Sequence, residues 1–246
     1  MKQRVRTDSL LVARGLAETR EKAQAMILAG EVLVDSQKIT KSGHKVPPGS
    51  DIRLLTKKTR FVSRGGEKLE GALDYFAIEV EGKICLDVGS STGGFTDCLL
   101  QRRAAKVYAV DVGKAQLHWN IRQDPRVVVC EKVNARYLSK ETVPEPVEFV
   151  CCDVSFISVT LILPALLPIL TPSAGLVVLA KPQFEVGKGA VGKGGIVRDP
   201  ALHEWTVQKV SRSLTELGFT KPMTMESPIP GAEGNKEFLI YVSERQ

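Results

Sequence analysis

One stretch decides the fold of this 246-residue chain: Ile84-Cys85-Leu86-Asp87-Val88-Gly89-Ser90-Ser91-Thr92-Gly93-Gly94-Phe95. An apolar run ends in an acid, a glycine and two hydroxyls, and a Gly-Gly pair then opens a predicted helix over 95–103. This order is typical of the first turn of a nucleotide-binding α/β sheet, because a ligand approaches the backbone closely only where no Cβ intervenes. An ordinary tight turn is the alternative, and the next strand argues against it.

The spacing of the glycines narrows the range of possible ligands. Gly89, Gly93 and Gly94 do not match the G-x-G-x-x-G of dinucleotide binders, and no G-K-[ST] follows as in a P-loop. The acid before the first glycine instead favours a ligand with a cationic end, and S-adenosylmethionine carries an ammonium and a sulfonium. We therefore predict S-adenosylmethionine as the cofactor, with these binding residues on the turn: Asp87, Gly89, Ser90, Ser91, Gly93, Gly94 and Phe95.

The next two predicted strands extend this cofactor site. A buried-type strand over 106–112 carries Asp111 near its end, where such sheets hold ribose hydroxyls with a carboxylate. Asn134 follows a third strand over 126–130 and suits an adenine edge, although a helix-capping role is equally compatible with the sequence. The predicted cofactor-binding residues at these strand ends are Asp111, Val112, Asn134 and Ala135.

The charge of the chain is concentrated in its first quarter. Residues 1–64 carry 14 lysines and arginines against 6 acids, whereas residues 65–246 carry 20 against 22. A basic segment attached to a neutral body is typical of a polyanion-binding module, and a merely well-solvated basic domain is the other interpretation.

Other classes of protein are disfavoured. The five cysteines form no C-x-x-C pair and indicate a reduced, cytoplasmic setting, and the three histidines show no zinc-like spacing, so no metal site is predicted. The N-terminus has no apolar leader. The longest apolar segment, 159–170, contains two prolines and is shorter than the ~20 residues of a spanning helix, so we predict no membrane partner.

Residues 1–59 are predicted to form a small α+β module. Two short helices, the first capped by Thr7 or Asp8 and the second by Thr19, precede strands at 32–34 and 51–55. The pattern resembles the RNA-binding domain of the small-subunit ribosomal protein S-four. A basic linker over 60–65 either is simply solvated or extends the polyanion-binding surface, and the sheet domain spans 66–246. The predicted RNA-binding residues are Arg4, Arg6, Arg14, Arg20, Lys22, Arg60 and Arg64.

Charged residues stand where the predicted sheet places its ligand crevice. Asp153 and Lys181 each end a buried-type strand, and Glu237 begins the last strand, which is expected to return antiparallel. Lys68 lies on a predicted helix ahead of the sheet and alone would be an ordinary surface lysine. A ribose hydroxyl is a poor nucleophile that must be oriented and lose its proton, so Lys181 is a candidate base with Asp153 orienting it.

The order Lys68, Asp153, Lys181, Glu237 is that of the Lys-Asp-Lys-Glu tetrad in FtsJ-like ribose 2′-O-methyltransferases. The whole chain resembles the TlyA family more closely, through these stretches: Ser63-Arg64-Gly65-Gly66-Glu67-Lys68-Leu69, Asp87-Val88-Gly89-Ser90-Ser91-Thr92-Gly93-Gly94-Phe95-Thr96, Asp153-Val154-Ser155-Phe156-Ile157-Ser158 and Lys181-Pro182-Gln183-Phe184-Glu185. The resemblance covers nearly all of the chain. It differs at Arg60-Phe61-Val62, where some members carry Arg-x-Trp-Val in a linker that supports cofactor binding.

The resemblance implies an activity and a fold. The fold is a Rossmann-like S-adenosylmethionine-dependent methyltransferase sheet with a small N-terminal S-four-like domain. The activity is 2′-O-methylation of cytidine in ribosomal RNA, with the four tetrad residues as catalytic groups and ribosomal RNA or ribosomal subunits as partners. The nucleotide, the subunit, the assembly state of the substrate and the oligomeric state are not implied.

Three other functions stay open at this point. Members of the family are often labelled hemolysins, and a catalytically silent RNA-binding or ribosome-assembly factor would need only the basic module. Base methylation is the nearest enzymatic alternative, but it favours an Asn/Asp-Pro-Pro-aromatic motif that Asp153-Val154-Ser155-Phe156 lacks. The Gly/Lys-rich loop over 187–195 is expected to be a substrate lid or simply disordered.

Overall fold

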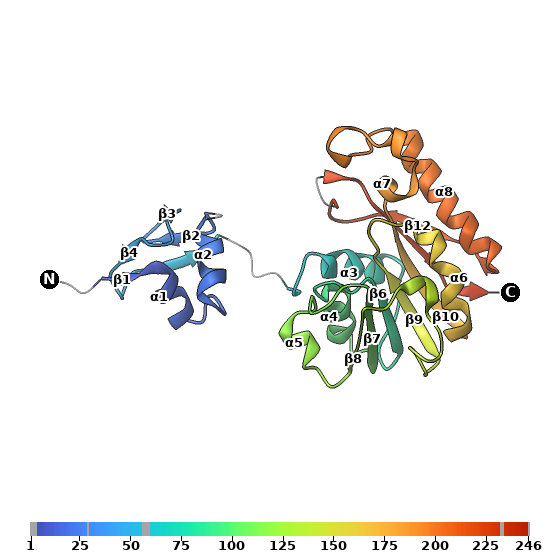
Figure 1. The fold of residues 1–246 in the computed structure, drawn as a ribbon, viewed down its shortest axis with the longest axis horizontal. Helices are drawn as coiled ribbons and strands as arrows, with labels where there is room; N and C mark the ends of the chain where they lie inside the picture. The colour runs from blue at the N-terminus through green and yellow to red at the C-terminus, as the bar shows by residue number, and fades with distance from the viewer. Residues whose placement is uncertain (1–3, 29, 56–59, 232–233, 246) are drawn as a thin grey trace. The chain divides into compact units, whose positions relative to one another are not determined.

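A computed structural model describes residues 4–28, 30–55, 60–231 and 234–245 of the chain. The chain divides into two compact units, an N-terminal unit, Met1–Thr59, and a C-terminal unit, Arg60–Gln246 (Figure 1). Lys57 and Lys58, which precede the predicted linker, lie outside the described residues. No helix among the described residues is long and apolar enough to cross a membrane.

The N-terminal unit packs two helices on a small antiparallel sheet of order β3-β2-β5. Its core joins Leu11 and Ile27 of the helices to Val32 and Val34 of the central strand. The elements are β1 (Val5–Arg6), α1 (Thr7–Ala13), α2 (Arg20–Leu28), β2 (Val32–Val34), β3 (Gln37–Ile39), β4 (Lys45–Val46) and β5 (Ile52–Leu54).

Local signals explain most of this unit and one hairpin that the sequence analysis missed. Thr19 accepts a hydrogen bond from the backbone N of Lys22 at 3.2 Å, as predicted for a cap, whereas α1 has no side-chain cap. Asp35 and Ser36 have φ of 50° and 69°, so they form the two-residue turn of a hairpin between β2 and β3. The sequence analysis did not predict strand β3, which completes this hairpin.

The C-terminal unit is built on a seven-stranded sheet of order β12-β13-β10-β9-β6-β7-β8. Strands β10, β9, β6, β7 and β8 run parallel, and β13 returns antiparallel between β10 and β12. The strands are β6 (Ile84–Val88), β7 (Lys106–Asp111), β8 (Val127–Glu131), β9 (Val147–Cys152), β10 (Leu170–Ala180), β11 (Phe219–Thr220), β12 (Met223–Glu226), β13 (Phe238–Val242) and β14 (Glu244–Arg245). The helices are α3 (Gly65–Tyr75), α4 (Gly94–Gln101), α5 (Trp119–Arg122), α6 (Leu163–Leu166), α7 (Pro182–Glu185) and α8 (Pro200–Glu216).

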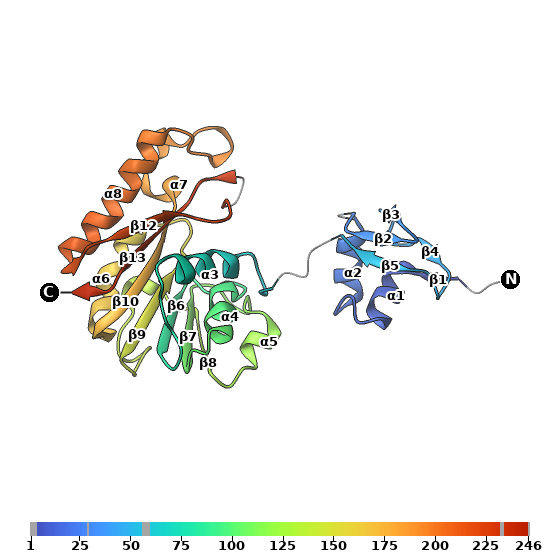
Figure 2. The same ribbon diagram turned by 180° about the vertical axis from the view of Figure 1, so that it is seen from behind.

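Helices cover both faces of this sheet. Figures 1 and 2 show α3 and α4 on one side and α6 and α8 on the other. One apolar cluster joins Leu69 of α3 and Leu99 of α4 to the sheet, and the other joins Leu166 of α6 and Val210 of α8 to it. The strands between these layers are buried on both faces, which is why they read as continuous apolar runs.

Two helical segments differ from what the sequence suggests. Helix α3, which carries Lys68, begins at Gly65, a residue that the sequence analysis placed in the linker. The apolar segment over 159–170 forms α6 flanked by two short 3₁₀ turns, because its prolines interrupt a continuous helix. The loop over 187–195 holds two further 3₁₀ turns, Lys188–Ala190 and Lys193–Gly195.

Candidate active site

The Gly-rich turn lies between β6 and α4, at the carboxyl end of the sheet. Gly89 has φ of 84°, and a Cβ built on it would lie 2.2 Å from the carbonyl oxygen of Asp153. Gly93 has φ of 94°, and its Cβ would lie 2.8 Å from Leu117. Only glycine combines this backbone conformation with this close approach, so the turn is specified by packing against β9 as well as by any ligand.

A cavity of about 490 Å³, here called the Asp111 cavity, opens beside this turn. Asp111 accepts hydrogen bonds from the backbone N of Ser91 at 2.8 Å and of Gly113 at 2.7 Å, which fix its carboxylate. Asn134 caps the following 3₁₀ turn by accepting from the backbone N of Arg136 at 3.1 Å, and it also lines the cavity. The predicted residues on the wall of this cavity are Gly89, Ser91, Asp111, Val112, Asn134 and Ala135.

Asp87 lies beneath the turn rather than on a cavity wall. Its side chain is fully buried, and its Oδ2 accepts a hydrogen bond from the Thr96 hydroxyl at 2.6 Å. No donor among the described residues is in hydrogen-bond position for the other oxygen, Oδ1. Burial raises the pKa of Asp87 to about 7, against the lowering effect of Thr96. Because one oxygen of this buried carboxyl has no hydrogen-bond donor, a positive charge close to it would be strongly stabilised.

A second cavity of about 300 Å³, the Lys68 cavity, lies on the other side of the turn. It shares Gly89, Ser91 and Asp153 with the Asp111 cavity, so the two cavities have a common wall. Ser90, Gly94 and Phe95 line the Lys68 cavity alone, and Gly93 lines neither.

The four charged residues of the predicted tetrad form two ion pairs. Lys68, 9% exposed, donates to Glu237, 2% exposed, with Nζ and Oε2 2.5 Å apart. Lys181 pairs with Asp153 and donates to the Ser155 hydroxyl at 3.1 Å. Lys68 and Asp153 line the same cavity, so the two pairs meet at one edge of the sheet. Buried charges that pair in this way hold defined positions, because each would be costly to leave alone.

The side chain of Glu237 is also confined by the loop before it. A Cβ on Gly231 would lie 2.1 Å from Oε1 of Glu237, and Gly231 lines the Lys68 cavity. The sequence analysis predicted no site residue in the 228–231 segment. Its position on the wall of this cavity has no sequence signal beyond the glycine itself.

Residues 154–157 also line the Asp111 cavity and were not predicted as site residues. Phe156 is 92% exposed with φ of 66°, and its ring centroid lies 5.3 Å from that of Phe184. A bulky residue in this conformation is uncommon, and an aromatic ring this exposed lacks its usual burial. The Asp-Val-Ser-Phe motif directly after β9 was the signal that could have identified these residues.

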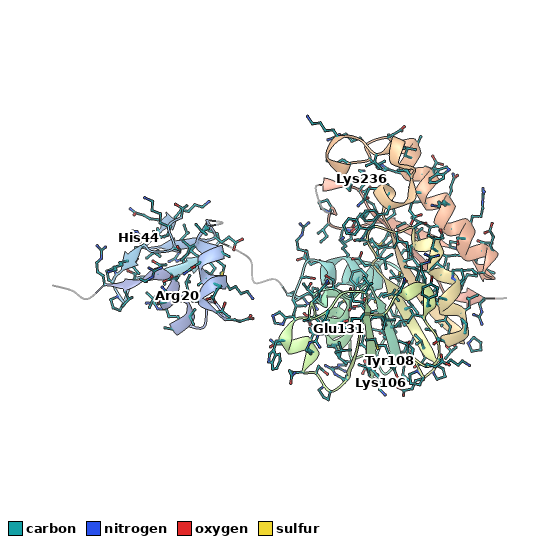
Figure 3. The ribbon with its side chains drawn as sticks, viewed as in Figure 1. Arg20, His44, Lys106, Tyr108, Glu131 and Lys236 are labelled. Atoms are coloured by element: carbon teal, nitrogen blue, oxygen red, sulfur yellow. The ribbon has the colours of Figure 1, made fainter. Side chains whose placement is uncertain are left out.

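The predicted RNA-binding residues of the N-terminal unit divide into three groups. Arg6 and Arg20, the latter labelled in Figure 3, both bond to the buried carboxylate of Asp8. Lys22 forms an exposed pair with Glu18, and Arg4 is exposed. Arg14 is different, because its guanidinium donates to the carbonyl oxygens of Pro48 and Ser50 and so ties α1 to a loop.

Residues 60–65 pack within the C-terminal unit rather than forming a free connector. Arg60 pairs with Glu70, and the ring of Phe61 is buried. Phe61 fits against Gly66, where a Cβ would lie 2.2 Å from its ring. Arg64 donates to the carbonyl oxygen of Pro230 at 3.1 Å and lines the Lys68 cavity. The buried ring of Phe61 thus anchors this segment to the unit, although Arg60 and Arg64 are exposed.

The described residues contain no group of three His, Cys, Asp or Glu side chains that could hold a metal ion. The site thus consists of two adjoining cavities. The Asp111 carboxylate is fixed in one of them, and the paired lysines Lys68 and Lys181 lie beside their common wall.

Comparisons with known proteins agree with this geometry. A family model described as FtsJ-like methyltransferase matches residues 61–244, and one described as S4 domain matches residues 5–52. The chain is 47% identical to the 16S/23S rRNA (cytidine-2′-O)-methyltransferase TlyA of Mycobacterium tuberculosis, over 98% of this chain and 91% of the relative. It is 48% identical to the putative rRNA methyltransferase YqxC of Bacillus subtilis, over 96% and 85%.

Solved structures show the same fold. A putative hemolysin from Streptococcus thermophilus is 43% identical, with a TM-score of 0.77, over all of this chain and 90% of that one. The fold, the two cavities and these matches define an S-adenosylmethionine-dependent methyltransferase. The chain belongs to the TlyA family of FtsJ-like methyltransferases with an N-terminal S4 domain, as the sequence analysis predicted.

Proposed function

We propose that this enzyme transfers the methyl group of S-adenosylmethionine to the ribose 2′-hydroxyl of cytidine in ribosomal RNA. The observation that carries the proposal is the common wall of the two cavities, which brings Lys68 and Asp153 next to the Asp111 cavity. Relatives that match over nearly the whole chain are named for this reaction on 16S and 23S rRNA. A ribosomal substrate would place the enzyme in the cytoplasm.

The residues of the Asp111 cavity suit the cofactor. Asp111 would accept from the ribose hydroxyls, and Val112, Asn134 and Ala135 would surround the adenine. The backbone of Gly89 to Ser91 would receive the methionine end, with the orphan oxygen of Asp87 favouring its positive charge. When bound, the cofactor supplies an electrophilic methyl group on a sulfonium.

The paired lysines and acids suit the nucleophile. The 2′-hydroxyl must lie in line with the methyl group, lose its proton as the new C–O bond forms, and do so away from water. We assign the role of proton acceptor to Nζ of Lys181, with Asp153 and Ser155 orienting it. Lys68, held by Glu237, would place a positive charge beside the developing ether oxygen.

The substrate side of the site suits an unpaired nucleotide. Sequence-specific enzymes of RNA act mostly on bases that are splayed out and stacked on aromatic rings. Phe156 offers such a ring at the edge of the Asp111 cavity. The free faces of Arg4, Arg6, Arg20 and Lys22 suit phosphates of structured RNA, whether in free rRNA or in a ribosomal subunit.

The proposal is tested by transfer of labelled methyl groups to rRNA and to ribosomal subunits, followed by mass mapping of the modified nucleoside. Lys181→Met should lower kcat by about 10²–10⁴-fold while the Kd for the cofactor stays within about twofold. Lys106→Met is the matched control and should leave kcat unchanged. Lys106, labelled in Figure 3, lies at the start of β7, and so at the end of the parallel strands that is away from the site. Label on a base, or label that survives Lys181→Met, would contradict the proposal, and no label at all would favour a silent RNA-binding factor.

A further inference from the structure

Glu185 is a buried acid that neither cavity explains. It ends α7, four residues after Lys181, and its side chain is 2% exposed. It lines neither the Asp111 cavity nor the Lys68 cavity, so it has no direct path to a ligand. A buried carboxylate is costly unless donors surround it, so its partners show what it is for.

Those partners come from two other segments. The Ser158 hydroxyl donates to one carboxylate oxygen at 2.5 Å, and the backbone N of Val159 donates to the other at 2.7 Å. Lys209 of α8 donates to the carboxylate at 2.7 Å. Lys209 also donates to the backbone oxygen of Glu185 at 3.0 Å and to the Ser158 hydroxyl at 3.3 Å. Three segments are thus joined at one carboxylate.

Two of these segments carry the proposed catalytic pair. Asp153 begins the segment that is held at Ser158, and Lys181 begins the segment that ends at Glu185. On the cavity side the segments meet through the Lys181 contacts to Asp153 and Ser155 and through the rings of Phe156 and Phe184. Glu185 joins the same two segments at their far ends through Ser158 and Val159, so that each segment is held at both ends.

We propose that Glu185 is a positioning residue, which locks the segment after β9 to the segment after β10 and thereby sets the geometry of the Lys181–Asp153 pair. This rests on the proposed function of that pair. A displacement of about 1 Å in a catalytic group can cost roughly 10²-fold in rate, so a device that acts only on position has a large effect on kcat. Binding of the cofactor on the Asp111 side does not use Glu185 and should be independent of it.

The test is Glu185→Gln in the full-length protein. Glutamine keeps the shape but has one acceptor oxygen in place of two and leaves Lys209 without its counter-charge. We expect kcat to fall by about 10- to 100-fold, with the KM for S-adenosylmethionine and the Kd for RNA within about twofold of wild type. Ser158→Ala removes a single donor and should lower kcat less, and it carries the test if Glu185→Gln does not fold.

Glu145→Gln is the matched control. Glu145 also accepts from one lysine and one hydroxyl, Lys106 at 2.6 Å and Tyr108 at 2.5 Å, both labelled in Figure 3, but these lie where β7 begins. Its kcat should equal that of wild type. Equal losses in the two variants, an unchanged kcat in Glu185→Gln, or a loss confined to KM would overturn the proposal.

A second measurement needs no RNA. The ¹⁵N NMR signal of the Lys181 ammonium, assigned with Lys181→Arg, should shift or broaden in Glu185→Gln and stay in place in Glu145→Gln. A Lys181 signal that is the same in wild type and Glu185→Gln would overturn the positioning role. A wild-type enzyme that methylates no RNA but shows the expected NMR change would instead contradict the proposed function alone.

Discussion

Each unit of the molecule keeps one aspartate fully buried, and the two are held in opposite ways. Asp8 of the N-terminal unit accepts from Arg6, Arg20, Gln24 and the backbone of Ser9. The hydrogen bond from Arg6 is the main reason that the pKa of Asp8 is well below its ordinary value, with burial opposing it. Asp87 of the C-terminal unit has the Thr96 hydroxyl on one oxygen and a pKa raised to about 7.

The difference separates two uses of a buried charge. A carboxylate surrounded by donors is part of the architecture, and in the N-terminal unit it also holds two guanidiniums at the surface. A carboxylate with an oxygen left over is stabilised only when something else arrives, and Asp87 lies under the turn between two cavities. Variants of the two residues should therefore respond to pH in opposite directions.

The largest effect is expected for Asp87→Asn, measured as the free energy of unfolding of the cofactor-free protein against pH. The folded-state pKa is raised from 3.8 to about 7, so its contribution to stability is complete below pH 4 and is lost as the pH rises through 7. A shift of this size corresponds to about 4 kcal/mol. Asparagine stays neutral, so the stability of wild type should fall relative to the variant between pH 4 and 7. Parallel curves would contradict the assignment.

A smaller loss is expected for Asp8→Asn, about 2–3 kcal/mol, because two guanidiniums and an amide lose a charged acceptor. Hydrogen exchange of the full-length protein should show faster exchange in residues 4–55 and no change in residues 60–231. Asp51→Asn is the control, because the carboxylate of Asp51 forms an exposed pair with Arg53, and the substitution should change the free energy of unfolding by less than about 0.5 kcal/mol. Equal effects in the two variants would remove the distinction between them.

The stability that Asp8 supplies is present above its ordinary pKa and is lost as the pH falls below about 4.

The smallest effect is expected for Lys22→Ala. Its pair with Glu18 is exposed, so the free energy of unfolding should change by less than about 0.5 kcal/mol. If Lys22 contacts a phosphate, the slope of log K against log salt for RNA binding should fall by about 1. Arg14→Ala should leave that slope unchanged and lower stability instead, because Arg14 is committed to backbone oxygens. The reverse pattern would assign Arg14 to the RNA.

The sequence predicted the parts of the site that depend on local order. The Gly-rich turn, Asp111 and the strand ends at Asp153 and Lys181 follow from apolar runs that stop at glycine or charge, and parallel strands bring such ends to one edge. The pairing of Lys68 with Glu237 does not follow in this way. These residues are 169 positions apart, and they meet because β13, which begins just after Glu237, inserts between β10 and β12. The sequence analysis expected this strand to return antiparallel, but only the family resemblance placed Lys68 and Glu237 in one site.

Two segments show why charge alone is a poor guide to what a residue contacts. Arg60 and Arg64 suggested a solvated connector, but Phe61 between them is buried and packs against Gly66, which has no side chain. Arg14 has the charge expected of an RNA contact, yet its partners are carbonyl oxygens in a loop some 35 residues away. The partners of Arg14 therefore lie beyond the range of any local pattern.

Gly89 sets a limit on how this enzyme can change. Any side chain there would push against the carbonyl oxygen of Asp153 and move the strand end that carries this acid. A substitution meant to reshape the donor pocket at that point would thus disturb the acceptor side in the same step. Altered donor specificity should therefore be sought around Val112 and Ala135, at the far rim, where the two halves of the reaction can be tuned separately.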